Sequence, residues 1–204
     1  MLEGVVKEFL GEVNEIVSRA CEMARQSLGE GSHGLEHTER VLRLALRIGR
    51  EEGAELEVVA LAAILHDIAR PLEDAGKIED HAAEGARIAR QFLGSLGYSK
   101  AEKVAHAIEA HRFSGSLKPR TLEAKILSDA DKLDAIGAIG IARVFMYSGE
   151  HRRGMWDSIR HFEEKILKLR NLMYTETARR IAEERHRFTE EFLKRLKMEL
   201  RGKA

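Results

Sequence analysis

The amino-acid sequence predicts an all-α protein, a helical bundle with a long C-terminal helical hairpin. Apolar residues recur at spacings of three and four along most of the 204 residues, as they do on the buried face of a helix. The sequence contains only two prolines, Pro71 and Pro119, so few positions can interrupt a helix. No segment shows the alternation of apolar and polar residues that is typical of a half-buried strand. We expect a single domain over residues 1–204, with a core at about 30–147 and a helical extension at about 152–200.

Two helices are predicted on either side of a glycine-rich segment near the N-terminus. The apolar stripe of the first helix consists of Val6, Phe9, Val13, Ile16, Ala20 and Met23. The segment LGEGSHG (28–34) carries three glycines and should end that helix. A second helix is expected at about 35–51, where one face carries Val41, Leu44, Ala45 and Ile48.

A third helix near 55–69 is expected at the centre of the bundle. Its segment VVALAAIL is apolar nearly all round, which is typical of a helix buried on every side. Pro71 prevents a smooth continuation of this helix. Further helices are predicted at about 80–94, 99–112 and 121–147.

The C-terminal part of the chain is predicted to form the hairpin. After SGEHRRG (148–154), one stripe is formed by Ile159, Phe162, Ile166, Leu169 and Met173, and the next by Ile181, Arg185, Phe188 and Phe192. These faces pack either on the core or on a second subunit, so a homo-oligomer formed through the C-terminal helices stays open.

The composition excludes several classes of protein. Lys+Arg and Asp+Glu both number 34, so the chain has no basic excess of the kind that binds duplex nucleic acid or an anionic membrane surface. No apolar run reaches the length of a membrane span. Cys21 is the only cysteine, so no intrachain disulfide can form, and the N-terminal residues do not resemble a signal peptide. We therefore expect a cytoplasmic protein without a membrane partner.

The strongest chemical signal is the pair His66-Asp67, which follows VVALAAIL directly. Polar groups at the end of a buried helix need partners, because burying them without hydrogen bonds costs several kcal/mol. Imidazole nitrogen and carboxylate oxygen suit divalent transition metals. The structural alternative is a salt-bridged pair without a metal.

Four more polar residues share faces with apolar residues of other expected helices. They are His37, His81, His111 and Asp131. A single core histidine is usually a satisfied polar group, but several that point inward from different helices indicate one shared polar site.

The order H…HD…D resembles the HD superfamily of metal-dependent phosphohydrolases. His37 matches the first histidine of that pattern, His66-Asp67 match the central pair, and Asp131 matches the last aspartate. The similar stretches are SHGLEHTERV, LAAILHDIARP, DHAAEGARIA, AHRFSG, ILSDADKLDAIGAIGIAR and the tail from His161 to Phe188. The chain departs from the pattern at Gly34, since related small HD hydrolases often carry His-Asp where this chain has His33-Gly34.

The resemblance implies an HD-type bundle that holds one or two divalent metals and hydrolyses phosphate esters or anhydrides, often in nucleotides. It implies that His37, His66, Asp67 and Asp131 bind the metal. We expect one divalent ion, with Mn preferred over Co, Ni, Fe, Mg or Zn, and the pattern leaves room for a second ion. The partner is then a small-molecule phosphate substrate, a nucleotide in our interpretation.

The remaining site residues are assigned roles in the reaction or in substrate binding. Asp67, Arg70 and Asp134 are the candidate catalytic residues, with Arg70 at a position where some HD proteins carry a phosphate-facing lysine. The candidate substrate-binding residues are Arg40, Arg70, His81, His111 and Lys132. Each has a structural alternative, as a surface cation or a core polar group.

Three functions stay open at this stage. The first is the metal-dependent phosphohydrolase. The second is a di-iron HD-type oxidase, which requires His81 and His111 as metal ligands and has Asp134 as a further candidate ligand. The third is a non-catalytic nucleotide-binding regulatory module.

The segment GAIGIA (137–142) is no phosphate-binding loop, since it lacks the lysine and the hydroxyl residue of a P-loop. Its small residues suit close helix packing.

Overall fold

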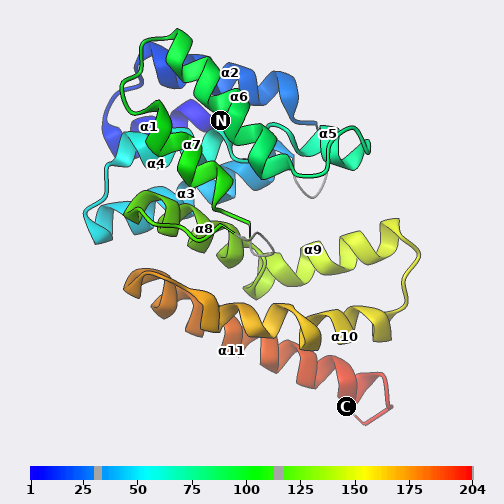
Figure 1. Ribbon diagram of the computed structural model, residues 1–204. Coiled ribbons are helices and arrows are strands. Elements are labelled where there is room, and N and C mark those ends of the chain that lie inside the picture. The colour runs from blue at the N-terminus through cyan, green and yellow to red at the C-terminus, as the bar shows by residue number, and fades with distance from the viewer. Residues whose placement is uncertain (30–33, 113–116, 204) are drawn as a thin grey trace. The chain divides into compact units, whose positions relative to one another are not determined.

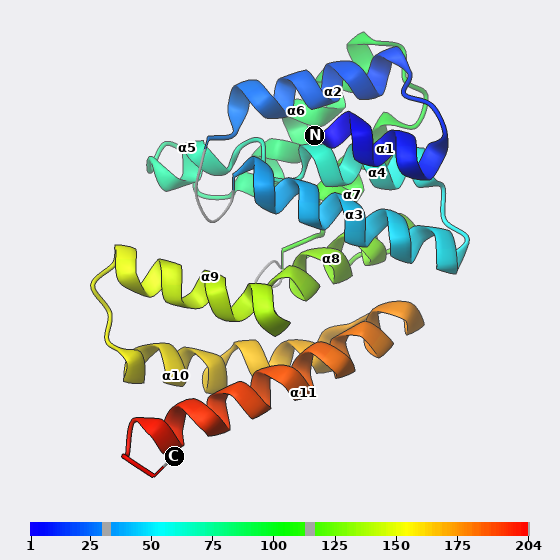
Figure 2. The same cartoon turned by 180° about the vertical axis from the view of Figure 1, so that it is seen from behind.

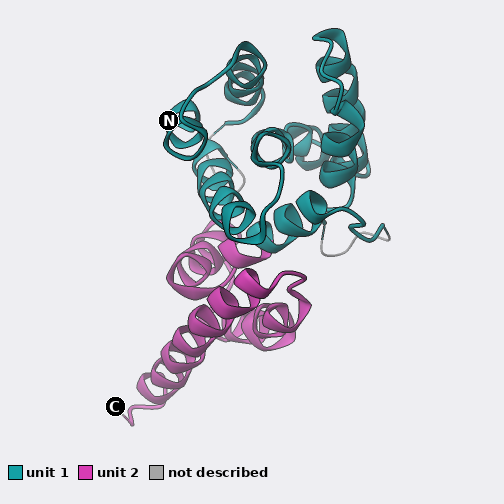
Figure 3. Ribbon diagram, turned by 90° about the vertical axis from the view of Figure 1, so that its left-hand side faces the viewer, with its two compact units in different colours: residues 1–131 teal, residues 132–204 magenta. Residues whose placement is uncertain are grey.

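The computed structural model describes residues 1–29, 34–112 and 117–203, which are helical apart from turns and loops and include no strand. This confirms the all-α prediction. The chain divides into two compact units, residues 1–131 and 132–204 (Figure 3). None of the described helices combines the length and the apolarity that crossing a bilayer requires.

Unit 1 (1–131) is built around one central helix (Figures 1 and 2). Its helices are α1 (Leu2–Leu10), α2 (Glu15–Ser27), α3 (Leu35–Glu52), α4 (Leu56–Leu65), α5 (Arg70–Asp74), α6 (His81–Ser95), α7 (Ala101–Glu109) and most of α8 (Leu122–Asp134). α4 contacts α1, α2, α3 and α7, and every residue from Val58 to Leu65 is fully buried. The central position expected for this all-round apolar helix is thus observed.

Short breaks divide two of the helices that were expected to be continuous. α1 ends at Leu10 and is followed by Gly11, whose φ of 86° is unfavourable for other residues. The Asn14 side chain caps the start of α2 by accepting a hydrogen bond from the Val17 N–H at 3.0 Å. The helix expected at 121–147 divides in the same way before Gly137, which has φ 78°. Cys21 is buried within α2, and burial raises the pKa of its thiol to about 12.

Unit 2 (132–204) continues from the end of α8 into α9 (Gly137–Glu150), α10 (Met155–Glu164), the 3₁₀ helix η1 (Ile166–Leu172) and α11 (Glu176–Glu199). α9 packs against α10 and α11, and η1 contacts both α10 and α11. The predicted hairpin is therefore present, with η1 and a short turn between its arms. Thr175 caps α11 by accepting a hydrogen bond from the Ala178 N–H at 3.3 Å.

The small residues of GAIGIA serve the turn that joins α8 to α9 more than the packing of helix faces. Ala138 and Ala142 are exposed, contrary to the expectation that they line a helix interface. Gly140 instead lies against the preceding backbone, where an added Cβ would be only 2.2 Å from the carbonyl oxygen of Ala135.

We expect Gly140→Ala to destabilise unit 2 by about 2 kcal/mol or more, because a backbone carbonyl cannot move aside as a flexible side chain can. Gly149→Ala is the matched control, since it lies in the same helix with nothing within 4 Å of the added methyl group. Trp156 is the only tryptophan and belongs to unit 2, so its fluorescence during urea unfolding reports this unit. Equal unfolding midpoints for the two variants would contradict the prediction.

Candidate metal centre

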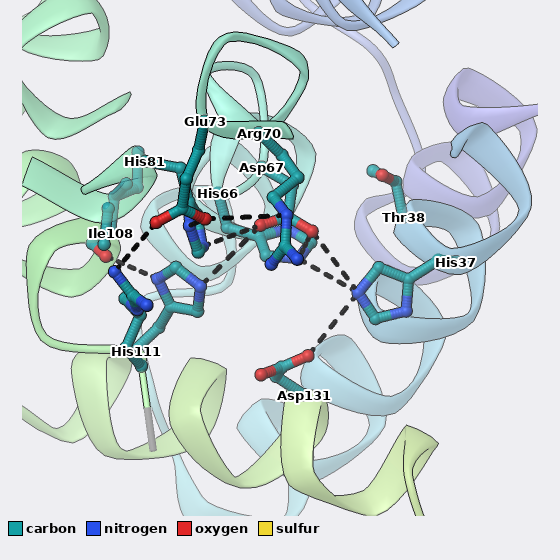
Figure 4. Close-up of polar contacts among 12 residues, drawn as sticks. His37, Thr38, His66, Asp67, Arg70, Glu73, His81, Ile108, His111 and Asp131 are labelled. Carbon is teal, nitrogen blue, oxygen red and sulfur yellow. Dashed lines mark hydrogen bonds and ion pairs between the residues drawn. The ribbon is translucent and has the colours of Figure 1, made fainter. Parts of the chain in front are cut away.

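Five helices of unit 1 bring polar side chains to one place, each at or next to a helix end (Figure 4). His37 lies in the first turn of α3, His66 and Asp67 directly follow α4, His81 begins α6, His111 comes shortly after α7, and Asp131 lies in the last turn of α8. The structure thus brings together the inward-facing residues that the sequence predicts. All are buried except Asp131, whose side chain is 28% exposed.

Asp67 occupies the middle of this cluster, and its two carboxylate oxygens face different histidines. Oδ2 lies 3.7 Å from His37 Nε2 and 3.5 Å from His66 Nε2. Oδ1 lies 3.3 Å from His81 Nε2 and 3.8 Å from His111 Nε2. The carboxylate therefore divides the cluster into a first group around Oδ2 and a second group around Oδ1.

The first group is completed by contacts among its other members. The Nε2 atoms of His37 and His66 are 3.3 Å apart, and His37 Nε2 lies 3.4 Å from Asp131 Oδ1. Burial raises the pKa of the Asp131 carboxyl, but the hydrogen bond with His37 and the electrostatic attraction to it hold that pKa well below its usual range. Asp131 is thus an anion next to three imidazoles.

Backbone contacts fix which nitrogen of two histidines is available. His66 Nδ1 lies 2.8 Å from the Ala63 carbonyl oxygen, and His111 Nδ1 lies 2.6 Å from that of Ile108. A carbonyl oxygen only accepts, so Nδ1 carries the proton and Nε2 of the neutral ring keeps its lone pair. Burial lowers the pKa of His66, and burial with the neighbouring His66 lowers the pKa of His111 to about 4. Both rings are therefore neutral at pH 7.

The second group contains a carboxylate that the sequence analysis did not single out. Glu73 of α5 places Oε2 2.7 Å from His81 Nδ1. Glu73 Oε1 also accepts a hydrogen bond from Arg112 at 3.2 Å. The only sequence signal was an acidic pair shortly after Pro71, because α5 has five residues and shows no apolar period.

The donor set fits divalent metal ions. Donors on one ion with bonds of ~2.1 Å lie ~3.0–3.4 Å apart, close to the separations within each group. Two sets of three residues have ligand atoms within 4.8 Å of one another, namely His37, His66 and Asp67, and Asp67, His81 and His111. Imidazole lone pairs and carboxylate oxygens that converge on one place repel one another, and a cation bound between them stabilises this arrangement.

Two arginines expected to bind substrate lie in unit 1. Arg70 begins α5, and its Nε contacts Asp74 Oδ1 at 2.9 Å and Glu73 Oε2 at 3.6 Å. Burial lowers the pKa of Arg70, but the Asp74 contact outweighs it and the pKa is raised. Arg40 is partly buried on α3, one turn after His37.

Lys132 and Asp134 belong to unit 2 and have partners within it. The Lys132 ammonium lies 4.9 Å from the ring centre of Tyr174. Asp134 is 1% exposed and pairs with Arg143 Nη1 at 2.7 Å.

Gly34, the departure from the family pattern, immediately precedes α3. It occupies the N-cap position, where no side-chain hydrogen bond closes the start of the helix. His33 lies outside the described residues.

Comparison with known proteins identifies the family. The HD domain matches residues 34–136, which include every member of the cluster described above. The chain is 37% identical to the uncharacterized protein YpgQ of Bacillus subtilis over 179 residues, which cover 83% of this chain and 85% of YpgQ. The chain belongs to the HD superfamily of metal-dependent phosphohydrolases, and it is a hydrolase.

Solved structures agree with this assignment. The crystal structure of Bacillus subtilis YpgQ in complex with ADP covers 92% of this chain and all of that one, with a TM-score of 0.76 and 32% identity. An HD-superfamily hydrolase from Bacillus thuringiensis covers 92% of this chain and 97% of its own, with a TM-score of 0.75 and 32% identity.

Part of the chain is also similar to a larger kind of protein. Ribonuclease Y of Cutibacterium acnes is 34% identical over 105 residues, which are 52% of this chain. The matched part is only 18% of that ribonuclease.

Proposed function

We propose that this hydrolase cleaves a phosphoester or phosphoanhydride bond of a nucleotide, with Mn²⁺ as the preferred cation. The observation that carries the proposal is the set of four imidazoles around the Asp67 carboxylate, at 3.3–3.8 Å. A bound divalent cation would polarise a phosphoryl oxygen and lower the pKa of a water. The ADP complex of YpgQ, a protein similar along most of its length, supports a nucleotide as substrate.

In this proposal the protein's own residues divide the work. His37, His66, Asp67 and Asp131 hold the cation, and His81 with His111 provide for a second ion or for substrate. Asp67 takes up the proton of the attacking water. The contacts of Arg70 with Asp74 and Glu73, its carboxylate partners among the described residues, use Nε, which supports a role for its terminal amino groups in holding phosphate oxygens.

We expect chelator-treated protein to be inactive and a divalent ion to restore hydrolysis of at least one nucleotide. The panel contains nucleoside mono-, di- and triphosphates, aryl phosphate esters and a single-stranded oligoribonucleotide, each with Mn, Co, Ni, Mg or Zn alone. Released phosphate and pyrophosphate are measured separately. Asp67→Ala protein purified in the same way excludes a contaminating phosphatase. If no substrate were cleaved with any ion, the regulatory-module hypothesis would replace this one.

The di-iron oxidase is the second candidate, because Asp67, His81 and His111 form a second group of donors. It predicts tightly bound iron in protein purified without added metal, which elemental analysis and electron paramagnetic resonance detect. Asp134, a further candidate ligand in that hypothesis, pairs with Arg143. This pairing favours the hydrolase.

We also propose that the protein is a homo-oligomer and that it is cytoplasmic. All exposed large apolar side chains among the described residues, apart from Met1, lie in unit 2, which supports a homo-oligomer formed through the C-terminal helices. The absence of a second cysteine that could pair with Cys21 supports a cytoplasmic location.

A further inference from the structure

His81 differs from two other histidines of the cluster in what holds its Nδ1. In His66 and His111 this atom faces a neutral backbone carbonyl, at 2.8 Å and 2.6 Å. In His81 it faces the Glu73 carboxylate at 2.7 Å. A carboxylate that accepts the Nδ1–H fixes the orientation of the ring and makes the Nε2 lone pair a stronger ligand for a metal ion. That Nε2 lies 3.3 Å from Asp67 Oδ1.

Glu73 is itself held in place by a network of charges. Arg112 donates to Glu73 Oε1 at 3.2 Å, and the same Nη1 lies 3.0 Å from Asp80 Oδ1. Asp80 caps α6 by accepting hydrogen bonds from the Ala82 and Ala83 N–H groups, at 2.8 and 3.2 Å. Arg112 directly follows His111. The network therefore ties α5 to the start of α6 and to the residue after His111, which are the places that carry the second group.

We propose that Glu73 is a positioning residue for a second divalent cation. By holding His81 with Nε2 toward Asp67, it raises the affinity of the group formed by Asp67, His81 and His111. The group formed by His37, His66 and Asp131 has no contact with Glu73 among those described, and its affinity is independent of Glu73. The proposal rests on the metal centre of the proposed function and is independent of the reaction catalysed.

Calorimetric titration of chelator-treated protein with Mn²⁺ tests this directly. The native chain should bind two ions. Glu73→Ala should leave the first affinity unchanged and weaken the second by about 10–100-fold, the usual effect of removing a carboxylate behind a ligand histidine. Glu73→Gln should lose less, because the amide oxygen still accepts the Nδ1–H but carries no charge.

Two controls separate positioning from general disruption. Asp74→Asn alters the adjacent carboxylate, which is more exposed and pairs with Arg70, and should leave both affinities unchanged. In a His81→Ala background, Glu73→Ala should cause no further loss, because its effect passes through His81. Thermal unfolding of the metal-free variants shows whether each remains folded.

A second Mn²⁺ bound by Glu73→Ala with native affinity would overturn the proposal, as would a native chain that binds only one ion. An additive loss in the His81→Ala background would also overturn it. If Glu73→Ala failed to fold, the smaller loss expected for Glu73→Gln would decide instead. A native chain that binds two ions but hydrolyses nothing contradicts the proposed function and leaves the role of Glu73 intact.

Discussion

Asp67→Ala should abolish metal binding and lower kcat/KM by at least about 1,000-fold, to the background of the assay. The reason is its central position, since its two oxygens face all four histidines, at 3.3–3.8 Å. No other residue of the cluster belongs to both groups of donors. His66→Ala should also abolish activity, because it removes a neutral Nε2 donor from the first group. Elemental analysis and nucleotide hydrolysis with added Mn²⁺ measure both effects.

The fold should survive these substitutions, because the helices are held by apolar burial around α4 rather than by the cluster. Far-ultraviolet circular dichroism should therefore show nearly unchanged helix content. His151→Ala replaces an exposed histidine of unit 2 and serves as the control for loss of an imidazole. Stoichiometric metal in both Asp67→Ala and His66→Ala would show that the cluster does not bind the ion.

The members of the candidate metal centre could be predicted because their helices have strong apolar patterns. His37 shares a face with Val41, and His66 follows a helix that is apolar all round, so burial of both is implied by helical geometry. The distances among them could not be predicted. They depend on how the helices of unit 1 cross, which no period within one helix encodes.

Helix breaks were predicted less well, for a local reason. The apolar stripe runs from Val6 to Met23 in helical register, although Gly11 reverses the backbone between α1 and α2. A lone glycine within a helical pattern is compatible both with a continuous helix and with a break between two helices. The same holds at Gly137, where the positive φ that separates α8 from α9 depends on the surrounding structure.

Glu73 shows a different limit of sequence reasoning. Its contact with His81 joins residues eight positions apart across a turn, outside any helical spacing. Asp129 shows the same limit, since the sequence around it does not indicate how deeply its carboxylate is buried. The structure buries it completely, whereas the Asp131 side chain is 28% exposed.

The three aspartates of SDADKLD should differ strongly in their effect on the metal. Asp131→Ala should eliminate metal-dependent activity, because Asp131 Oδ1 lies 3.4 Å from His37 Nε2 and its low pKa keeps it anionic. Asp134→Ala should weaken activity by a smaller factor, through loss of the 2.7 Å pair with Arg143. Asp129→Ala should affect metal binding least, since Asp131, two residues further on, is the aspartate that lies beside His37.

Activity alone would not establish this order, because each variant can also lose stability. Removing a fully buried carboxylate such as Asp129 leaves its partners unsatisfied, at a cost of about 1–3 kcal/mol. Mn²⁺ affinity must therefore be measured below the unfolding transition of each variant. Under those conditions Asp129→Ala should bind Mn²⁺ like the native chain while melting at a lower temperature, and Asp131→Ala should show the reverse. An active Asp131→Ala enzyme would contradict this assignment. Loss of Mn²⁺ affinity in Asp129→Ala but not in Asp131→Ala would identify Asp129, two residues earlier in α8, as the last ligand instead.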